Sequence, residues 1–349
     1  MFLMKTPTRF SPEGHVPLLS FEGTSFECGH QLGMAWRHAL QQNALKAKDH
    51  WTPWWWKGPI AQIVQRKAPH LADIYRGMAK GAGIDEELCG YAPISAPVDA
   101  CTSFAVHAEQ TLDGVGMAGQ TKDTGLDRTF LFQVVRLKTN DAPGLLTLTY
   151  PGEMIGYGFA QNGISIFRNA LYVTPQRPAG NLPFDAFGML THFAESIEEV
   201  VELAKKHGVR TVAHMTVADP TGRGVGLELC QGEVEVIEGR AGLYAHGNHT
   251  VSAKLKHRVT DKDRDEERGG ASAHRQSRLY ELMEQNRGRL TPQLMFQNLS
   301  DHANFPLSIC SHRSEEYHTS AAVVVEPSRG LLHVTRGAPC QNWPTTYRL

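Results

Sequence analysis

The residues that could do chemistry in this chain gather around one cysteine, Cys101. It follows Asp99 and Ala100 at the end of a proline-containing, turn-prone stretch, and an extended run begins at Cys101 itself. A thiol attacks carbonyl carbons as the thiolate, so it needs a base close by. An α-amino group on the same residue can be that base, because its pKa is ~7.7–8. Cleavage of the bond between Ala100 and Cys101 would create such an amine.

The thiol of Cys101 could make this cut itself. Attack of its sulfur on the carbonyl of Ala100 gives a thioester, which water then opens. This predicts a helical fragment 1–100 and a larger catalytic fragment 101–349, which together form a single domain. A thiol, an adjacent amine and a nearby carboxylate would complete a centre for amide cleavage.

Hairpin geometry predicts which carboxylate lies near the Cys101 thiol. The run that begins at Cys101 turns near residues 112–113 and returns through Gly119-Gln120-Thr121-Lys122-Asp123. Opposed residues of an antiparallel pair have a constant sum of residue numbers, which places a residue within about two of position 124 opposite Cys101. Asp123 lies in that window. An ordinary turn aspartate beside Thr124 is the alternative that the spacing leaves open.

The elements that must position these residues indicate an α+β protein. Apolar spacing predicts helices over 24–48, 60–82, 184–195, 196–207, 273–286 and 292–300. Alternation and turn residues predict strands over 101–109, 114–120, 129–138, 145–150, 154–160, 163–173, 211–218, 224–230, 233–238 and 242–246, and a last hairpin over 319–335. Consecutive antiparallel strands flanked by helices favour sheets with helices on their outer faces over βαβ units.

Composition limits the class of protein. The 349 residues carry a formal net charge of −1, so charge favours neither nucleic acid nor an anionic membrane surface as a partner. No apolar run approaches the ~18 residues of a membrane span. Six cysteines without a C-x-x-C pair are typical of reduced thiols in a cytoplasmic protein. We therefore expect a cytoplasmic protein that acts on a small molecule, and a homo-oligomer is left open.

Neither a metal nor a cofactor is predicted. His246-x-x-His249, His302 and His312 could suggest a metal, but the first pair lies at a strand end and no cysteine or acid completes a zinc-like spacing. The glycines of residues 222–226 precede no helix, which argues against a dinucleotide loop.

Several motifs, in this order along most of the chain, resemble a known family. They are Glu27-Cys28-Gly29-His30-Gln31-Leu32-Gly33, Asp99-Ala100-Cys101-Thr102, Gly119-Gln120-x-x-Asp123, Gly247-Asn248-His249, Arg275-x-x-Arg278-Leu279 and Ser308-Ile309-Cys310-Ser311-His312. Together they are similar to the acyl-coenzyme A:6-aminopenicillanic acid acyltransferase family, the C45 cysteine peptidases of the N-terminal nucleophile (Ntn) hydrolases. The resemblance implies an αββα sandwich, self-cleavage before Cys101, and amide hydrolysis or acyl transfer.

The resemblance also implies roles for individual residues. Cys101 would be the nucleophile, Asp123 the partner acid and Asn248 the donor to the developing oxyanion. Residues that would support these three or contact substrate are Thr102, Lys122, His249 and Arg278. The chain departs from the family pattern at Ala100, usually glycine, at Lys122, often aromatic, and at Ser311, often arginine. Lys122 would favour an acidic or polar group on the substrate.

Three functions are compatible with these residues. An amide-bond hydrolase acting on a linear amide or N-acyl compound is favoured, because hydrolysis needs only water. The alternatives are an acyltransferase that moves an acyl group from an acyl-coenzyme A or an amide to an amine, and a non-catalytic member that binds a ligand. Pocket walls are expected from the helix at 184–195 and from the loop after Tyr150-Pro151-Gly152-Glu153.

Overall fold

The computed structural model describes residues 15–47, 59–89, 100–154, 156–171, 182–256, 270–314 and 317–349. Asp99 and the turn-prone stretch before it lie outside the described residues. Within the described part, no helix is both long enough and apolar enough to cross a membrane.

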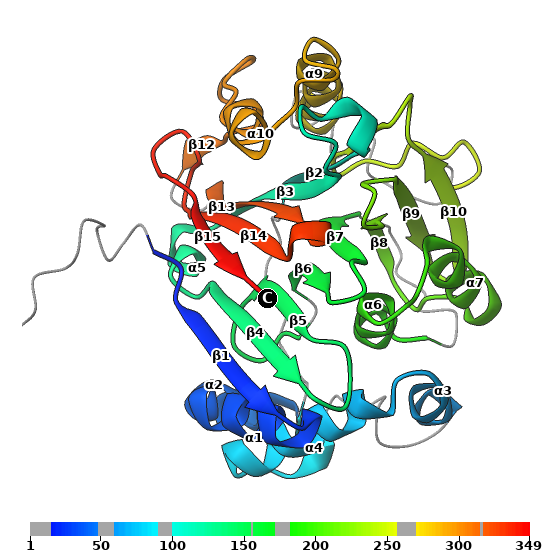
Figure 1. Cartoon of the computed structure of the whole chain (residues 1–349), viewed down its shortest axis with the longest axis vertical. Helices are drawn as coiled ribbons and strands as arrows, with labels where there is room; N and C mark the ends of the chain where they lie inside the picture. The colour runs from blue at the N-terminus through cyan, green and yellow to red at the C-terminus, as the bar shows by residue number, and fades with distance from the viewer. Residues whose placement is uncertain are drawn as a thin grey trace, which may run out of the picture.

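Two sheets form the centre of the molecule (Figure 1). The first sheet has the order β1 (Leu18–Gly23), β4 (Gln133–Thr139), β5 (Leu145–Thr149), β6 (Tyr157–Ala160), β7 (Ser165–Ala170), β8 (Val212–Ala218), β9 (Gly224–Cys230), β10 (Glu233–Glu238). The second has the order β11 (Leu243–His246), β2 (Ala100–Val106), β3 (Met117–Thr124), β13 (Tyr317–Glu326), β14 (Leu331–Arg336), β15 (Thr345–Arg348), and β12 (His312–Ser314) pairs with β13. All of these pairs are antiparallel except β1 with β4.

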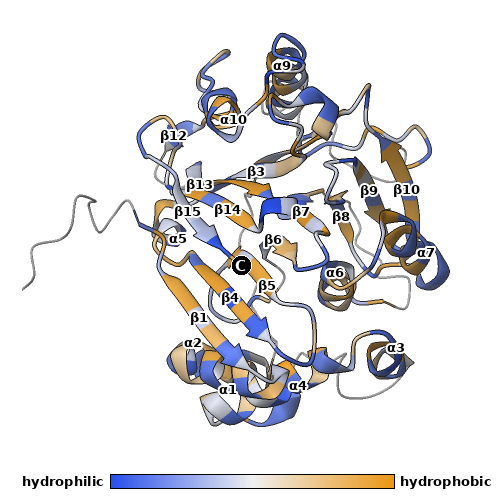
Figure 2. Ribbon diagram, viewed as in Figure 1, coloured by the Kyte–Doolittle hydropathy of each residue, from blue (hydrophilic) through white to orange (hydrophobic). Residues whose placement is uncertain are grey.

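Helices cover the outer face of each sheet. On the first sheet they are α1 (Ser25–Ala35), α2 (Arg37–Ala47), α3 (Pro59–Lys67), α4 (Pro69–Ala82), α6 (Phe184–His192) and α7 (Ile197–His207), and on the second α9 (Ala271–Glu284) and α10 (Pro292–Leu299). The described residues also form a short helix, α5 (Leu126–Thr129), and single 3-10 turns at Glu86–Leu88, Ala108–Gln110 and Pro327–Arg329. In Figure 2 the outer helix α7 is largely hydrophilic, whereas β9 is largely hydrophobic.

Three apolar layers hold these elements together. One lies between the helices and the first sheet, the second between the two sheets, and the third between the second sheet and α9 and α10. Strand β2 contributes to two layers by alternation, because Ala105 packs between the sheets while Phe104 and Val106 pack under the helices. The predicted αββα sandwich is therefore confirmed.

The structure differs from the predicted elements at a few boundaries. The helix expected over 24–48 is divided at Trp36, and the one expected over 60–82 is divided at Ala68, before Pro69 at the first helical position. Strands β1, β12 and β15 and helix α5 were not predicted. Ser196 caps α7, since its hydroxyl accepts the N–H of Glu199 at 3.1 Å.

The N-terminal helices pack unusually closely because glycines face carbonyl groups. A Cβ on Gly33 of α1 would lie 2.1 Å from the carbonyl oxygen of Met78, and one on Gly81 of α4 would lie 2.0 Å from that of His30. Gly29 and Gly77 meet the facing helix at equally short distances. The backbones of α1 and α4 can approach only while these positions have no side chain.

We expect Gly33→Ala to lower the free energy of unfolding by about 3 kcal/mol, because the new methyl group meets backbone that cannot turn aside. Met34→Ala is the control on the same helix; this side chain is half exposed, and we expect a change within about 0.5 kcal/mol. Urea unfolding of both variants measures the difference. Equal stabilities would contradict this account of the helix contact.

Candidate active site

The register of β2 with β3 decides where the candidate groups lie. Cys101 faces Lys122, and Ala100 faces Asp123. The expected hairpin and window are confirmed, but the residue directly opposite the thiol is the lysine. Since neighbouring residues of a strand point to opposite faces, Cys101 and Lys122 share one face of the sheet, whereas Ala100 and Asp123 share the other. The carboxylate is therefore paired with the residue before the cysteine.

Asp123 is fully buried beside a β-bulge. The register of β13 against β3 shifts between Thr319 and Ala321, and the Thr319 hydroxyl donates to Asp123 Oδ1 at 2.7 Å. The other carboxylate oxygen has no hydrogen-bond partner within the described residues. Burial raises the pKa of Asp123 to about 6, although Arg275, Thr319 and Lys122 each act to lower it. β-Bulges are over-represented next to active sites.

Asn248 reaches the backbone of the nucleophile candidate. Its Oδ1 accepts the N–H of Cys101 at 2.7 Å, and its Nδ2 donates to the carbonyl of Ala170 at 3.1 Å. The Ser272 hydroxyl accepts the N–H of Asn248 at 2.6 Å, and it contacts His249 Nδ1 at 2.7 Å. Asn248 is thus a neighbour of the nitrogen that would become the α-amine, and His249 supports it through Ser272.

Arg275 is a site residue that we did not select from the sequence. It is buried on α9, and its guanidinium donates to Thr102 Oγ1 at 3.1 Å and to Asn248 Oδ1 at 2.8 Å. Its charge also acts on Asp123. The motif Arg275-x-x-Arg278 contained the signal, but spacing alone could not say which arginine faces the sheet.

Arg278 lies elsewhere. It pairs with Asp301, at 2.9 Å, and with Glu281, at 2.7 Å, on the outer side of α9. These two carboxylates raise its pKa further above the usual value. The structure therefore brings Cys101, Thr102, Lys122, Asp123, Asn248 and His249 together and leaves Arg278 apart from them.

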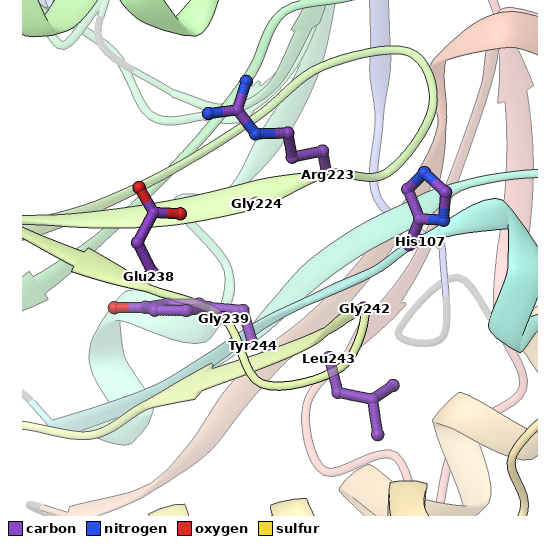
Figure 3. A pocket seen from close by; sticks show the side chains of 8 residues that line it. All are labelled: His107, Arg223, Gly224, Glu238, Gly239, Gly242, Leu243 and Tyr244. Carbon is purple, nitrogen blue, oxygen red and sulfur yellow. The ribbon is translucent and has the colours of Figure 1, made fainter.

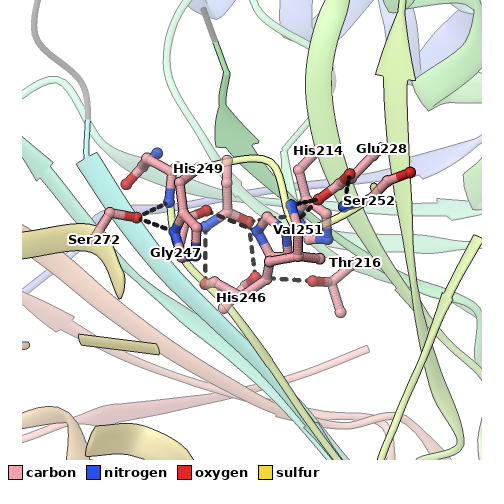
Figure 4. Close-up of polar contacts among 12 residues, drawn as sticks. His214, Thr216, Glu228, His246, Gly247, His249, Val251, Ser252 and Ser272 are labelled. Atoms are coloured by element: carbon pink, nitrogen blue, oxygen red, sulfur yellow. Dashed lines mark hydrogen bonds and ion pairs between the residues drawn. The ribbon is translucent and has the colours of Figure 1, made fainter. Parts of the chain in front are cut away.

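A buried histidine–glutamate network holds the segment that carries Asn248 (Figure 4). Glu228 Oε1 lies 3.0 Å from His246 Nε2 and accepts the N–H of Val251 at 2.7 Å, while Glu228 Oε2 accepts the N–H of Ser252 at 2.9 Å. Burial raises the pKa of Glu228, but these hydrogen bonds outweigh burial and hold it below its usual value. His214 stacks on His246 with ring centroids 3.6 Å apart.

Cations and aromatic rings surround the thiol on its own face. Lys122 Nζ lies 3.8 Å from Cys101 Sγ and 5.9 Å from the centre of the Tyr157 ring. Arg168, buried in an ion pair with Glu153, lies over the rings of Tyr157 and Phe184. The segments after Tyr150 and at the start of α6 therefore contribute to this side of the site, where pocket walls were expected.

A separate pocket lies at the far end of β2 (Figure 3). This cavity of about 110 Å³ is lined by His107, Arg223, Gly224, Glu238, Gly239, Gly242, Leu243 and Tyr244. His107 is six residues along the chain from Cys101, or about 20 Å at the rise of a strand. The pocket is therefore distinct from the polar cluster around the thiol.

The fold and the cluster define a class of protein. Two mainly antiparallel sheets between helical layers are the arrangement of the Ntn-hydrolase fold. Residues 117–341 match the family described as acyl-coenzyme A:6-aminopenicillanic acid acyl-transferase. The chain belongs to this family. The match confirms the predicted family, the prediction that the chain is an enzyme, and the general activity of amide hydrolysis or acyl transfer.

Solved structures with a similar fold share little sequence with the chain. A mutant conjugated bile acid hydrolase from Clostridium perfringens is 14% identical, with 71% of this chain and 97% of that one covered and a TM-score of 0.49. The Caenorhabditis elegans N-acylethanolamine-hydrolyzing acid amidase ortholog is 15% identical, with 65% of this chain and 93% of that one covered and a TM-score of 0.47. Penicillin V acylase from Agrobacterium tumefaciens is 14% identical, with 67% of this chain and 82% of that one covered and a TM-score of 0.44. No curated protein matches the sequence.

The raised pKa of Asp123 predicts how stability changes with pH. Between its unfolded value, about 3.8, and about 6 the folded chain holds more protons on this group than the unfolded chain, so the stability contribution falls as pH rises. We expect Asp123→Asn to gain on the order of 3 kcal/mol relative to the parent chain between pH 4 and pH 7.5.

Urea unfolding at the two pH values measures this gain, with Cys101→Ala in every sample so that cleavage cannot differ among them. Asp85→Asn, which changes an exposed aspartate, is the matched control and should show no such gain. Parallel pH profiles for the parent and Asp123→Asn chains would contradict the raised pKa.

Proposed function

We propose that this chain is an amide-bond hydrolase whose nucleophile, Cys101, is exposed by cleavage of the Ala100–Cys101 bond. The observation that carries the proposal is the placement of Cys101 at the start of β2. Its sulfur lies beside Lys122, its nitrogen is held by Asn248, and Asp123 faces the preceding residue. All of these groups are buried, so charges act strongly on them.

Maturation would begin with the thiol as nucleophile. The Cys101 sulfur attacks the carbonyl carbon of Ala100, the thiol proton passes to the Cys101 nitrogen, and the C–N bond breaks to leave a thioester and a free amine. Water then opens the thioester, giving a carboxylate on Ala100 and a thiol on Cys101. Asp123 lies on the face of Ala100, where a protonated carboxyl could donate to the peptide under attack.

Turnover would use the new amine. The α-amine of Cys101 takes the thiol proton, the sulfur attacks a substrate amide, and the proton passes to the leaving amine. Water then hydrolyses the acyl-enzyme. Asn248 would orient the amine through Oδ1, the atom that already accepts the Cys101 N–H. Its side-chain NH₂ group, with two protons, would serve the oxyanion, a contribution of about 2.7–4 kcal/mol.

The two fragments would stay together after cleavage. Strand β1, before the cut, pairs with β4, after it. The backbone and hydroxyl of Ser25 donate to Asp141, and the Trp36 indole donates to Gln133 Oε1 at 2.8 Å. Residues 1–100 and 101–349 therefore form one domain in this proposal. We place the chain in the cytoplasm, because six scattered cysteines without a C-x-x-C pair are typical of reduced thiols.

Acyl transfer is the second candidate, and the family membership favours it. The same acyl-enzyme would react with an amine in place of water. The ratio of products distinguishes hydrolysis from acyl transfer. When an acceptor amine is added to the enzyme and a substrate that it cleaves, a new amide forms only if the amine outcompetes water at the thioester.

We expect purified protein to consist of two fragments that meet between Ala100 and Cys101 and elute together in gel filtration. Cys101→Ala should be a single intact chain, because the attacking sulfur is absent. Cys230→Ala, a buried cysteine on β9, is the matched control and should be cut like the parent. Intact mass spectrometry reads the outcome, and an uncut parent chain would contradict self-cleavage.

Turnover should depend on the same sulfur. In a screen of short-chain, aryl and aminoacyl amides, Cys101→Ala should lose at least about a thousandfold in kcat/KM, whereas Cys230→Ala should keep its rate. A non-catalytic binding protein would instead bind an amide without turning it over, and its rate would not differ between the parent and Cys101→Ala.

Lys122 should select the charge of the acyl group. For substrates that differ only in an anionic group on the acyl part, Lys122→Met should lower the preference for the anionic one about tenfold, because the buried ammonium is lost. The readout is the ratio of kcat/KM values, so a general loss of thiol reactivity cancels. Lys138→Met, an exposed lysine on β4, is the control, and an unchanged ratio in Lys122→Met would remove charge selection from the proposal.

A further inference from the structure

We propose that His302, Cys310, His312 and Cys340 form a structural zinc site beside the second sheet. Two thiols and two imidazoles are the ligand set of closed, four-coordinate zinc sites. Their candidate ligand atoms all lie within 4.8 Å of one another. None of these four residues is a reacting group in the proposed amide cleavage.

The distances among these atoms fit a tetrahedral ion. Zn–S bonds of about 2.3 Å and Zn–N bonds of about 2.05 Å give edges of about 3.8 Å between sulfurs and about 3.6 Å between sulfur and nitrogen. The Cys310 and Cys340 sulfurs are 3.6 Å apart. His312 Nε2 lies 3.4 Å from the first sulfur and 3.2 Å from the second. Three of the four ligands are therefore already arranged around one point.

His302 supplies the fourth ligand. Its ring centroid lies 5.2 Å from that of His312, and the ring is exposed, so a rotation of its side chain suffices to complete the set. Cys340 is exposed as well, which leaves an open path from solvent for the ion. Soft thiolate ligands with imidazole in this geometry favour Zn²⁺ over Mg²⁺, Ca²⁺ or Mn²⁺.

Three separate segments bring these ligands together. His302 follows α10. Cys310 lies just before β12, and His312 is its first residue. Cys340 lies in the loop between β14 and β15, which Figure 1 draws beside β12. An ion here would tie the loop after α10 and the last hairpin to the edge of the sheet. The long chain segments between the ligands make such a cross-link entropically effective.

The site also adjoins the candidate active site. Ser311, between two ligands, donates its N–H to Thr319 Oγ1 at 2.9 Å and accepts the N–H of Thr319 at 3.0 Å. The Thr319 hydroxyl in turn donates to Asp123. An ion held by Cys310 and His312 would therefore steady the threonine that orients the buried carboxylate.

Metal content tests the proposal directly. Full-length protein without a histidine tag, produced in zinc-supplemented medium and gel-filtered, should contain about one zinc per chain. Cys340→Ser and His302→Ala change exposed side chains and should retain at least about tenfold less zinc after dialysis against a chelator. Cys230→Ser and His107→Ala, outside the cluster, should retain as much as the parent.

Two further measurements separate zinc from its alternatives. Cobalt added to metal-free protein should give the absorption bands of a tetrahedral thiolate complex in the parent and not in Cys340→Ser. A chelator should lower the melting temperature of the parent chain and leave that of Cys340→Ser unchanged. The proposal is overturned by a Cys310–Cys340 disulfide, seen as a loss of two hydrogens in intact mass, by metal-free protein in which both thiols react with an alkylating agent, or by unaltered zinc in both ligand variants.

Discussion

The pairing of β2 with β3 is the constraint on which the candidate site depends. It places Cys101 opposite Lys122 and Ala100 opposite Asp123. Because a strand alternates its faces, the sulfur and the carboxylate lie on opposite sides of the same sheet. The thiol meets the Lys122 ammonium between the two sheets, whereas Ala100 meets the Asp123 carboxyl under the helices. A shift of one residue could place Asp123 opposite Cys101, with Thr124 opposite Ala100.

The rest of the site compensates the cost of burying polar groups. Arg275, on α9, donates hydrogen bonds to the side-chain oxygens of Thr102 and Asn248. Its positive charge also acts to lower the pKa of Asp123. Glu228 is satisfied by His246 and by two backbone N–H groups, and so it stays ionised inside the protein. Asp123 has only one hydrogen-bond partner for its two oxygens within the described residues, which is why burial prevails over its cationic neighbours.

The helical layers contribute to the site from two directions. The described residues before Cys101 pack on the first sheet: α1 and α4 meet through their glycines, and β1 pairs with β4, so a cut before Cys101 would leave the core intact. On the other side, α9 supplies Arg275 and Ser272, and the bulge in β13 supplies Thr319. The candidate site in the second sheet thus receives polar groups from the neighbouring strand β13 and from helix α9.

Most strands and helices, and the β2–β3 hairpin with its candidate pair, follow from local patterns in the sequence, because alternation, caps and turn residues act over a few residues. Local patterns could not choose Arg275 over Arg278, since both belong to one helix and only packing decides which side chain is buried. Nor could they join Cys310 and His312 with His302 and Cys340, whose spacing matches no zinc motif. The sequence by itself determined the chemistry available at Cys101 and the strand that bears it. The tertiary structure alone decided which distant groups meet it, because contacts between segments far apart in the chain depend on how whole layers pack.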